Sequence, residues 1–551
     1  MQSPTTLDRR LQRAATRGTG TARPYHALAW GPGEPRIVRR DLVSHSSAPA
    51  AVSRAPKSLA FFAHLADPQV VDVQSPGRFE FFETLNRRPD AHPFYPAARP
   101  QEALGVHAVE ALVRTVNSVR ESPDSGVPLS LAISAGDNLD NAQKNELQWF
   151  LALMAGGEVD PGSGSAAYQG VQDAAWEDPT YWHPDLAPDR YRELWGFPDY
   201  PGLLAEALRP LRAEGLALPW LSCFGNHDGL VLGNSLATSG YRDLVLGGRK
   251  AVMLPPGFDA VQHASEFHGS PETFLTGPSR QVVADPRRRI VDRREVVEAI
   301  LGASGLPAGH GYSRASARAG TAYCVHDLDG GPLPVRFLLL DTTNMDGFFE
   351  GSIGRRQLQW LEERLIEVSS NYVDTDGRRV WTASTQHRLV VLTSHHCLDD
   401  LVNSHRDARG FEDDQPRVLA AEVEGLLHRF PNVVLWANGH RHANKIWPRP
   451  DIRGRTAGFW EVSTGGITDW PCQIRLLEVV AREGDTIEIL STMVDSDVPA
   501  DPGQAEGLAR LVALHRELAA NDPFNGLDSY REGRAEDRNV RLLLPAPFAA
   551  S

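Results

Sequence analysis

The chain has 551 residues, of which 41% are hydrophobic and 23% are charged, a balance typical of folded globular proteins rather than disordered or fibrous ones. Its formal net charge is −14, which disfavours binding to nucleic-acid polymers and to anionic membranes, and we expect neither as a partner. No apolar run is long enough to cross a bilayer.

The four cysteines are far apart and have no CxxC spacing, which favours buried thiols in a reducing compartment over disulfides. Cys397 lies beside a histidine pair, but nothing else in the sequence supports thiol chemistry. Arg9-Arg10 resembles the start of an export signal, yet no apolar stretch follows it. We therefore predict a cytoplasmic protein, and the sequence leaves its oligomeric state open.

We divide the chain into three parts. Residues 1–56 are rich in Arg, Pro, Gly and Ser and are expected to form an N-terminal extension over the surface. Residues 57–500 are expected to form the main domain, with insertions at about 155–215 and 234–320. Residues 501–551 are expected to form a C-terminal helical tail, with a helix over 507–519.

Short apolar runs, rich in β-branched and aromatic residues, follow one another from residue 58 onwards. They cover residues 59–65, 129–134, 219–224, 335–340, 389–393, 433–436 and 460–464. Continuous apolar runs of this length are typical of buried strands. Helical patterns over 103–119 and 357–368 would cover the sheets, so the sequence predicts a layered α/β domain.

The insertions favour structural over functional interpretations. The aromatic residues of the first insertion, from Tyr168 to Trp195, are more typical of a small local core than of a surface that stacks a nucleobase. The run Arg287-Arg288-Arg289 in the second is more typical of a solvated or salt-bridged helix end than of a phosphate-binding site.

A polar cluster directly follows five of the apolar runs. The clusters are Asp67-Pro68-Gln69, Gly136-Asp137-Asn138, Gly225-Asn226-His227-Asp228, His395-His396 and Gly439-His440-Arg441-His442. Any one of them is compatible with a turn or a buried polar pair. Because the carboxyl ends of strands form the ligand-binding crevice of layered α/β proteins, we expect the five to converge there. Carboxylate, amide and imidazole ligands together suit two divalent metal ions, with Mn, Fe, Zn and Mg as candidates.

This series of motifs resembles the signature of the calcineurin-like metallophosphoesterases over roughly residues 58–464, with the insertions unaligned. The region from Tyr323 through 341–342, 351–354 and 357–361 is similar to an actinobacterial subgroup that has Asp-Pro-Gln as its first motif. The resemblance implies that residues 57–500 form the catalytic domain. It also implies a four-layer α/β/β/α sandwich of two mixed β-sheets flanked by helices, with a dinuclear metal centre where the strand ends of the sheets meet.

The resemblance assigns a ligand to each cluster. It places Asp67, Gln69, Asp137 and His442 on one metal, and Asp137, Asn226, His395 and His440 on the other. Asn138, His396 and Arg441 are expected to support these ligands or to contact the substrate. Gln69 stands where most of the family has histidine; its amide oxygen is a harder donor that favours Mn, Mg or Fe over Zn.

The implied reaction is hydrolysis of a phosphoester, with a metal-bridging hydroxide as the nucleophile. We expect His227 to protonate the leaving alkoxide or to stabilise its charge, and Asp228 to orient His227 by accepting from its other ring nitrogen. The expected substrate is a small organic phosphate mono- or diester, with nucleotides and cyclic nucleotides among the candidates. The alternative is a non-catalytic binding scaffold of the same fold with a weakened metal site, of which Gln69 would be the first sign.

Overall fold

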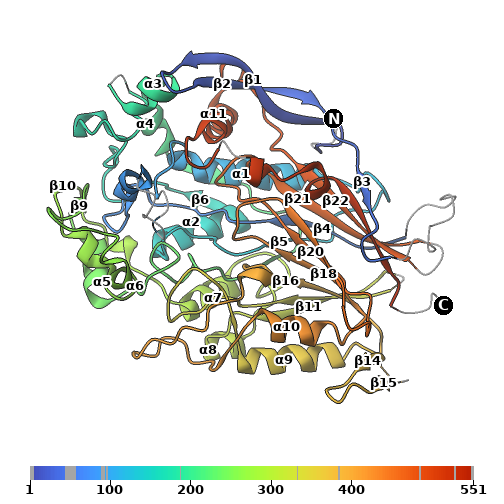
Figure 1. Ribbon diagram of the computed structural model, residues 1–551. Helices are drawn as coiled ribbons and strands as arrows, with labels where there is room; N and C mark the ends of the chain where they lie inside the picture. The colour runs from blue at the N-terminus through green and yellow to red at the C-terminus, as the bar shows by residue number, and fades with distance from the viewer. Residues whose placement is uncertain are drawn as a thin grey trace.

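The computed structural model (Figure 1) describes residues 5–43, 57–87, 94, 97–185, 188–331, 333–382, 385–482, 486–526 and 529–547. In these residues, seven strands form the first large sheet. Their order across the sheet is β3 (Ile37–Arg39), β23 (Val540–Pro545), β22 (Thr486–Val494), β21 (Ile474–Ala481), β4 (Lys57–Leu65), β5 (Leu131–Ser134) and β8 (Trp220–Ser222). Strands β4, β5 and β8 are parallel, whereas β21 pairs antiparallel with both β22 and β4. The sheet is therefore mixed, and it contains the predicted strands 59–65, 129–134 and 219–224.

Six strands form the second large sheet. Their order is β11 (Cys324–Leu328), β12 (Val335–Leu339), β16 (Leu389–Thr393), β18 (Val433–Asn438), β20 (Phe459–Ser463) and β19 (Lys445–Arg449). The four inner strands are parallel, and each edge strand is antiparallel to its neighbour. The inner strands are the other four predicted ones, and their apolar sequences suit strands that are buried on both faces.

The two faces of the second sheet contribute to different parts of the core. In β12, Phe337 and Leu339 belong to the large core shared with the first sheet, and the ring of Phe337 packs edge-on against Phe62 of β4 at 5.2 Å. The intervening Leu338 belongs to a second core. This alternation follows from the period of two in a strand, which points successive side chains to opposite faces.

Helices cover the outer face of each sheet (Figure 1). On the second sheet, α9 (Arg355–Ile366) and α10 (Ala420–Leu427) complete the second core with Leu361, Leu365 and Val423. On the first sheet lie α1 (Gly105–Ser118) and α2 (Lys144–Ala155), while α11 (Gly507–Asn521) packs on α1. The predicted helices correspond to α1, α9 and α11, and the predicted α/β class with two mixed sheets flanked by helices is confirmed.

The insertions contain short elements. The first has β6 (Gly157–Val159), α3 (Arg190–Trp195), α4 (Leu203–Ala207) and β7 (Leu211–Ala213). The second has α5 (Ser239–Leu246), β9 (Arg249–Ala251), α6 (Ala264–Gly269), β10 (Ser279–Gln281), α7 (Arg293–Gly302) and α8 (Arg314–Ala319). Small strand pairs are formed by β13 (Ile353–Gly354) with β17 (Arg417–Val418), and by β14 (Asn371–Val373) with β15 (Arg379–Trp381).

The structural interpretation is confirmed for the basic run of the second insertion and in part for the aromatic residues of the first. Trp176 lies in a small core with Tyr181, whereas Tyr168 and Trp182 lie in a larger core that includes α11 residues such as Leu514. The three arginines of the basic run form ion pairs. Their partners are Asp285 for Arg287, Asp72 for Arg288 and Glu295 for Arg289.

Both flanking parts of the chain contribute to the first sheet. The N-terminal part supplies β3, which pairs in parallel with β23 from the C-terminal part. It also forms a hairpin of β1 (Arg9–Thr19) and β2 (Pro24–Pro32), which packs on α11 (Figure 1). The division into extension, main domain and tail stays a prediction, but its outer parts complete the sheet that carries three of the polar clusters.

All four cysteines are buried free thiols, as predicted. Burial raises the pKa of the Cys397 thiol well above its usual range, which makes it a poor nucleophile. Among the helices of the described residues, none has the length and apolar character needed to cross a membrane.

Candidate metal centre

The five polar clusters converge where strand ends of the two sheets meet, and their backbone is unusual. Five of the predicted ligands have a positive φ angle, a conformation that non-glycine residues rarely adopt. They are Asp67 at 49°, Gln69 at 38°, Asp137 at 51°, His440 at 67° and His442 at 48°. Each such residue costs free energy and persists only where the surrounding structure enforces it, typically at functional sites. This concentration of strain marks the clusters as one site.

Glycines allow the loops to approach one another. A Cβ atom on Gly225 would lie 2.2 Å from the backbone nitrogen of Asp137, and one on Gly439 would lie 2.6 Å from Oδ2 of Asp67. Backbone hydrogen bonds join the loops directly, from the N–H of Gln69 to the carbonyl of Asp137 at 2.9 Å. Only glycine fits at 225 and 439, which explains its place in these two motifs.

Asp137 lies at the centre of the site. Its Oδ2 is 3.0 Å from Nε2 of His395, and its Oδ1 accepts from the backbone N–H of His227 at 2.8 Å. Nδ1 of His440 lies 3.3 Å from the same Nε2 of His395. Burial opposes ionisation of Asp137, but the neighbouring histidines prevail and lower its pKa below the usual range. The residue predicted to bridge two cations is therefore an ionised carboxylate within reach of two imidazoles.

Asp67 and His442 form a second group beside it. Nε2 of His442 is 3.3 Å from Oδ1 of Asp67, while its Nδ1 is 2.6 Å from Oδ2 of Asp469. A buried carboxylate on the far nitrogen of a histidine fixes its tautomer and directs the other nitrogen to a metal. Ligand atoms of Asp67, Asp137 and His395 all lie within 4.8 Å of one another, close enough to share a cation.

Two amide oxygens provide the most direct test of whether a metal fits. Oε1 of Gln69 and Oδ1 of Asn226 are buried without a hydrogen-bond partner among the described residues. The amide of Asn226 is held in place by its Nδ2, which donates to the carbonyl of Gly233 at 2.8 Å. Buried acceptor oxygens without hydrogen-bond partners cost free energy, and a cation bound to each oxygen would remove this cost. The residues present therefore fit a pair of divalent metal ions.

The structure also favours His395 over His396 as a ligand. Nδ1 of His395 lies 3.0 Å from the carbonyl of Ala135, which leaves Nε2 directed at Asp137. In His396 both ring nitrogens have protein partners, Oγ1 of Thr342 at 2.8 Å and the carbonyl of Phe349 at 2.9 Å. His396 lies within ligand range of His395 and His440, but its hydrogen bonds suit a supporting residue.

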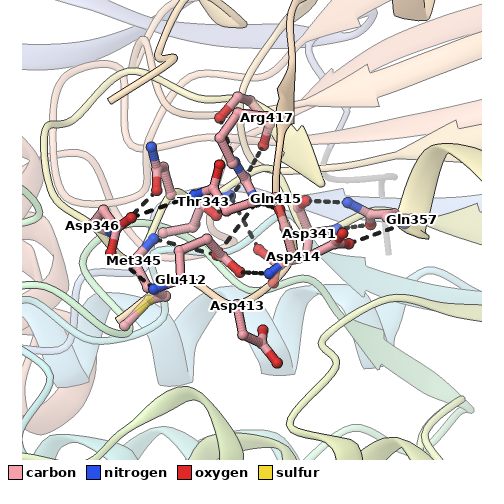
Figure 2. Close-up of polar contacts among 12 residues, drawn as sticks. Asp341, Thr343, Met345, Asp346, Gln357, Glu412, Asp413, Asp414, Gln415 and Arg417 are labelled. Atoms are coloured by element: carbon pink, nitrogen blue, oxygen red, sulfur yellow. Dashed lines mark hydrogen bonds and ion pairs between the residues drawn. The ribbon is translucent and has the colours of Figure 1, made fainter. Parts of the chain in front are cut away.

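A polar network holds the loop that runs from Asp341 through Thr343 to Asp346 (Figure 2). Thr342, the partner of His396, belongs to the same loop. Asp341 accepts from the N–H of Thr343 at 3.0 Å, and its own N–H donates to Gln357 at 2.8 Å. Asp346 accepts from the N–H of Glu412 at 2.9 Å, which ties the loop after β12 to the segment before β17. The loop behind His396 is thus fixed on both sides.

One prediction about the site is wrong. Asp228 does not contact the ring of His227: its carboxylate accepts from the N–H groups of Asn138, Leu139 and Gly225, at 2.8, 3.0 and 2.8 Å. Nδ1 of His227 lies instead 2.6 Å from the carbonyl of Asp140. The reason is that Asp228 points back under the loop that follows Asp137. Asn138 completes this arrangement by donating from Nδ2 to Oδ2 of Asp228 at 3.0 Å.

The clusters open into a cavity of about 440 Å³. Its lining includes Gln69, Asp137, Asn226, His227, His440 and His442. Phe82, Phe94 and Phe267 give it an apolar part, and Asp140, Arg99, Arg441 and Arg531 give it charge. Arg441 is held by Asp400 through two hydrogen bonds of 2.7 and 2.6 Å.

Sequence reasoning missed four residues here: Asp140, Asp469, Arg99 and Arg531. The spacing in Gly136-Asp137-Asn138-Leu139-Asp140 placed Asp140 near the ligands, and was the one available signal. The other three lie in segments with no motif and reach the site through tertiary contacts.

Comparisons with known proteins add little. No family model matches the sequence, and no curated protein matches it. Among solved structures, a dimetal phosphatase from Danio rerio matches with 11% identity and a TM-score of 0.33, over 80% of this chain and 100% of that chain. At this level of similarity the match carries no functional argument, so the function has to be inferred from the geometry of the site.

Proposed function

We propose that this chain is a phosphoester hydrolase that depends on two divalent metal ions and acts on small organic phosphate mono- or diesters. The observation that supports this most strongly is the pair of buried, unpartnered amide oxygens of Gln69 and Asn226. They lie in the site that also contains the carboxylates of Asp67 and Asp137. We also propose, on the order of its motifs, that it is a calcineurin-like metallophosphoesterase of the subgroup with Asp-Pro-Gln first.

Two cations held by Asp67, Gln69, Asp137, Asn226, His395, His440 and His442 would supply the positive charge that activates water and stabilises the phosphoryl oxygens. The chain's own contribution is to position the groups around them. His227 engages its Nδ1 with the carbonyl of Asp140, so Nε2 is the nitrogen left to serve the leaving oxygen. That Nε2 is 4.0 Å from Oδ2 of Asp137, within the reacting region of the cavity.

The cavity supports a small substrate with an organic part. Its volume of about 440 Å³ is in the range of small-molecule sites. Phe82, Phe94 and Phe267 belong to one apolar cluster and would cover an organic group. The net charge of −14 disfavours a long polyanion. The buried free thiols support a reducing, cytoplasmic location, which we also propose.

The proposal is tested by removing metals with a chelator, restoring Mn, Fe, Zn or Mg in turn, and assaying p-nitrophenyl phosphate and bis-p-nitrophenyl phosphate. We expect turnover of at least one substrate in at least one metal, and its loss in Asp137→Asn. A matched control is Asp376→Asn, because the Asp376 side chain is 66% exposed in the loop between β14 and β15. Absence of turnover in every metal would favour the binding scaffold instead.

A further inference from the structure

Two arginines share one buried carboxylate beside the candidate metal centre. Nε of Arg99 donates to Oδ1 of Asp469 at 2.7 Å, and Nη1 of Arg531 lies 3.0 Å from Oδ2 of the same residue. That Oδ2 is also 2.6 Å from Nδ1 of His442, a candidate metal ligand. The two guanidinium groups are therefore connected to the metal centre through a single residue.

The segment that carries Arg531 is fixed to the ligand loop. Arg531 lies in α12 (Ser529–Glu532), and its carbonyl accepts from the N–H of Asn444, two residues after His442, at 3.0 Å. Nδ2 of Asn444 donates to the carbonyl of Glu532 at 3.3 Å. The guanidinium group of Arg531 is held in place by Asn525, whose Oδ1 accepts a hydrogen bond from Nη2 at 2.9 Å. Arg531 is thus positioned before any ligand binds, which lowers the entropic cost of binding.

This pair keeps hydrogen-bonding capacity beside the cavity. The side chains of Arg99 and Arg531 line the cavity and keep 13% and 21% of their surface exposed. Besides the carboxylate that they share, the carboxylates of Asp140 and Asp522 attract Arg99 at longer range. The carboxylate of Asp522 also accepts from the N–H groups of Phe524 and Asn525. Nη1 of Arg99 has no hydrogen-bond partner among the described residues.

We propose that Arg99 and Arg531 bind a second anionic group of the substrate, so that the natural substrate carries a phosphate or carboxylate besides the ester that is cleaved. This inference rests on the proposed phosphoesterase function. Guanidinium groups held in fixed positions are suited to oxyanions, because they offer several charged donors at once. The cavity then combines a metal centre for the ester, an apolar part for the carbon chain and an arginine pair for the second anion.

The test compares propyl phosphate with 1,3-propanediol bisphosphate, which differ only by a second phosphate on the same three-carbon chain. With metal-loaded wild type we expect a kcat/KM about 10-fold to 100-fold higher for the bisphosphate, mainly through a lower KM, as charge-assisted hydrogen bonds predict. Arg531→Gln and Arg99→Gln should each remove most of this preference, measured as the ratio of the kcat/KM values for the two substrates. The ratio cancels any loss of activity that both substrates share because the bond to Asp469 is gone. Arg378→Gln, whose side chain is 79% exposed on the protein surface, is the matched control and should keep the preference.

Two outcomes would overturn the inference. If both arginine variants lower kcat/KM equally for the two substrates, the arginines act on the metal centre, directly or through Asp469, and bind no second anion. If both variants keep the wild-type preference, the arginine pair binds no substrate group. If wild type hydrolyses neither compound, the p-nitrophenyl assays described above, which include a diester, decide the phosphoesterase proposal. In that case equilibrium binding of the two compounds, measured by calorimetry on the same four proteins, decides the arginine site by the same comparison.

Discussion

Asp228 is the residue whose predicted and observed roles differ most. Replacing it tests whether it orients His227, as the sequence predicts, or holds the loop after Asp137, as the structure indicates. Its Oδ1 accepts from the N–H groups of Asn138 and Leu139, and its Oδ2 accepts from the N–H of Gly225 and from Nδ2 of Asn138. Burial, reinforced by Asp137, raises the pKa of Asp228 to about 7, and the donors facing it oppose that shift. All four partners are donors, so the site requires four acceptor positions.

The perturbation is Asp228→Asn, which keeps the shape but replaces one of the two acceptor oxygens with an NH₂ group. Either orientation of the new amide places its NH₂ group against two donors, so two buried hydrogen bonds are lost. At about 1–3 kcal/mol for each unsatisfied buried group, the free energy of unfolding should fall by about 2–6 kcal/mol. Because the same bonds hold the loop of Asp137, we also expect the variant to retain less metal.

The assay is urea unfolding together with metal analysis after dialysis. Asp376→Asn is the control and should stay within about 0.5 kcal/mol of wild type, as exposed substitutions usually do. The reasoning is refuted if Asp228→Asn unfolds like wild type, keeps its full metal content and loses only kcat. That result would restore the role first predicted, in which Asp228 orients His227.

Three further predictions concern other parts of the chain. His227→Ala should lower kcat by orders of magnitude for poor leaving groups while metal content stays near normal, and loss of the metals would contradict its assigned role. Gln69→His should shift metal preference toward zinc without abolishing turnover, as kcat measured in each metal would show; an unchanged preference would speak against tuning by this residue. Burial raises the pKa of Glu517 from 4.5 to about 7, so between these values the folded protein holds a proton that the unfolded chain has released. The free energy of unfolding should therefore fall as pH rises through this window, and Glu517→Gln should flatten that slope in unfolding curves; an equal slope in both proteins would count against it.

The strands and the ligand clusters were predictable because each is a local signal. A run of apolar residues identifies a strand such as β16 from its own sequence, and a polar cluster after it identifies the end that binds ligands. The structure brings all five clusters together, and it adds the positive φ angles at residues such as Asp67 and His442 that no local pattern reveals. The choice of His395 over His396 gained its physical reason only from the hydrogen bonds of the two rings.

The features of the fold and the site that the sequence does not reveal depend on contacts between distant segments. Strands β3 and β23 pair although about 500 residues separate them, and neither sequence has a pattern that predicts this pairing. Asp469 and Arg531 reach the site in the same way, since their relation to His442 exists only in the folded chain. The wrong partner for Asp228 has the same origin: adjacency to His227 in sequence suggested a contact that the turn between them prevents.

The central claim, that the chain holds two metal ions in one site, is tested most directly by counting them. Metal analysis of the purified protein, saturated with Mn and freed of excess ion, should give about two ions per chain in wild type and fewer in Asp137→Asn. Control Asp376→Asn should match wild type, since its carboxylate lies on the surface. Less than one ion per chain in wild type, or an unchanged count in Asp137→Asn, would contradict the account.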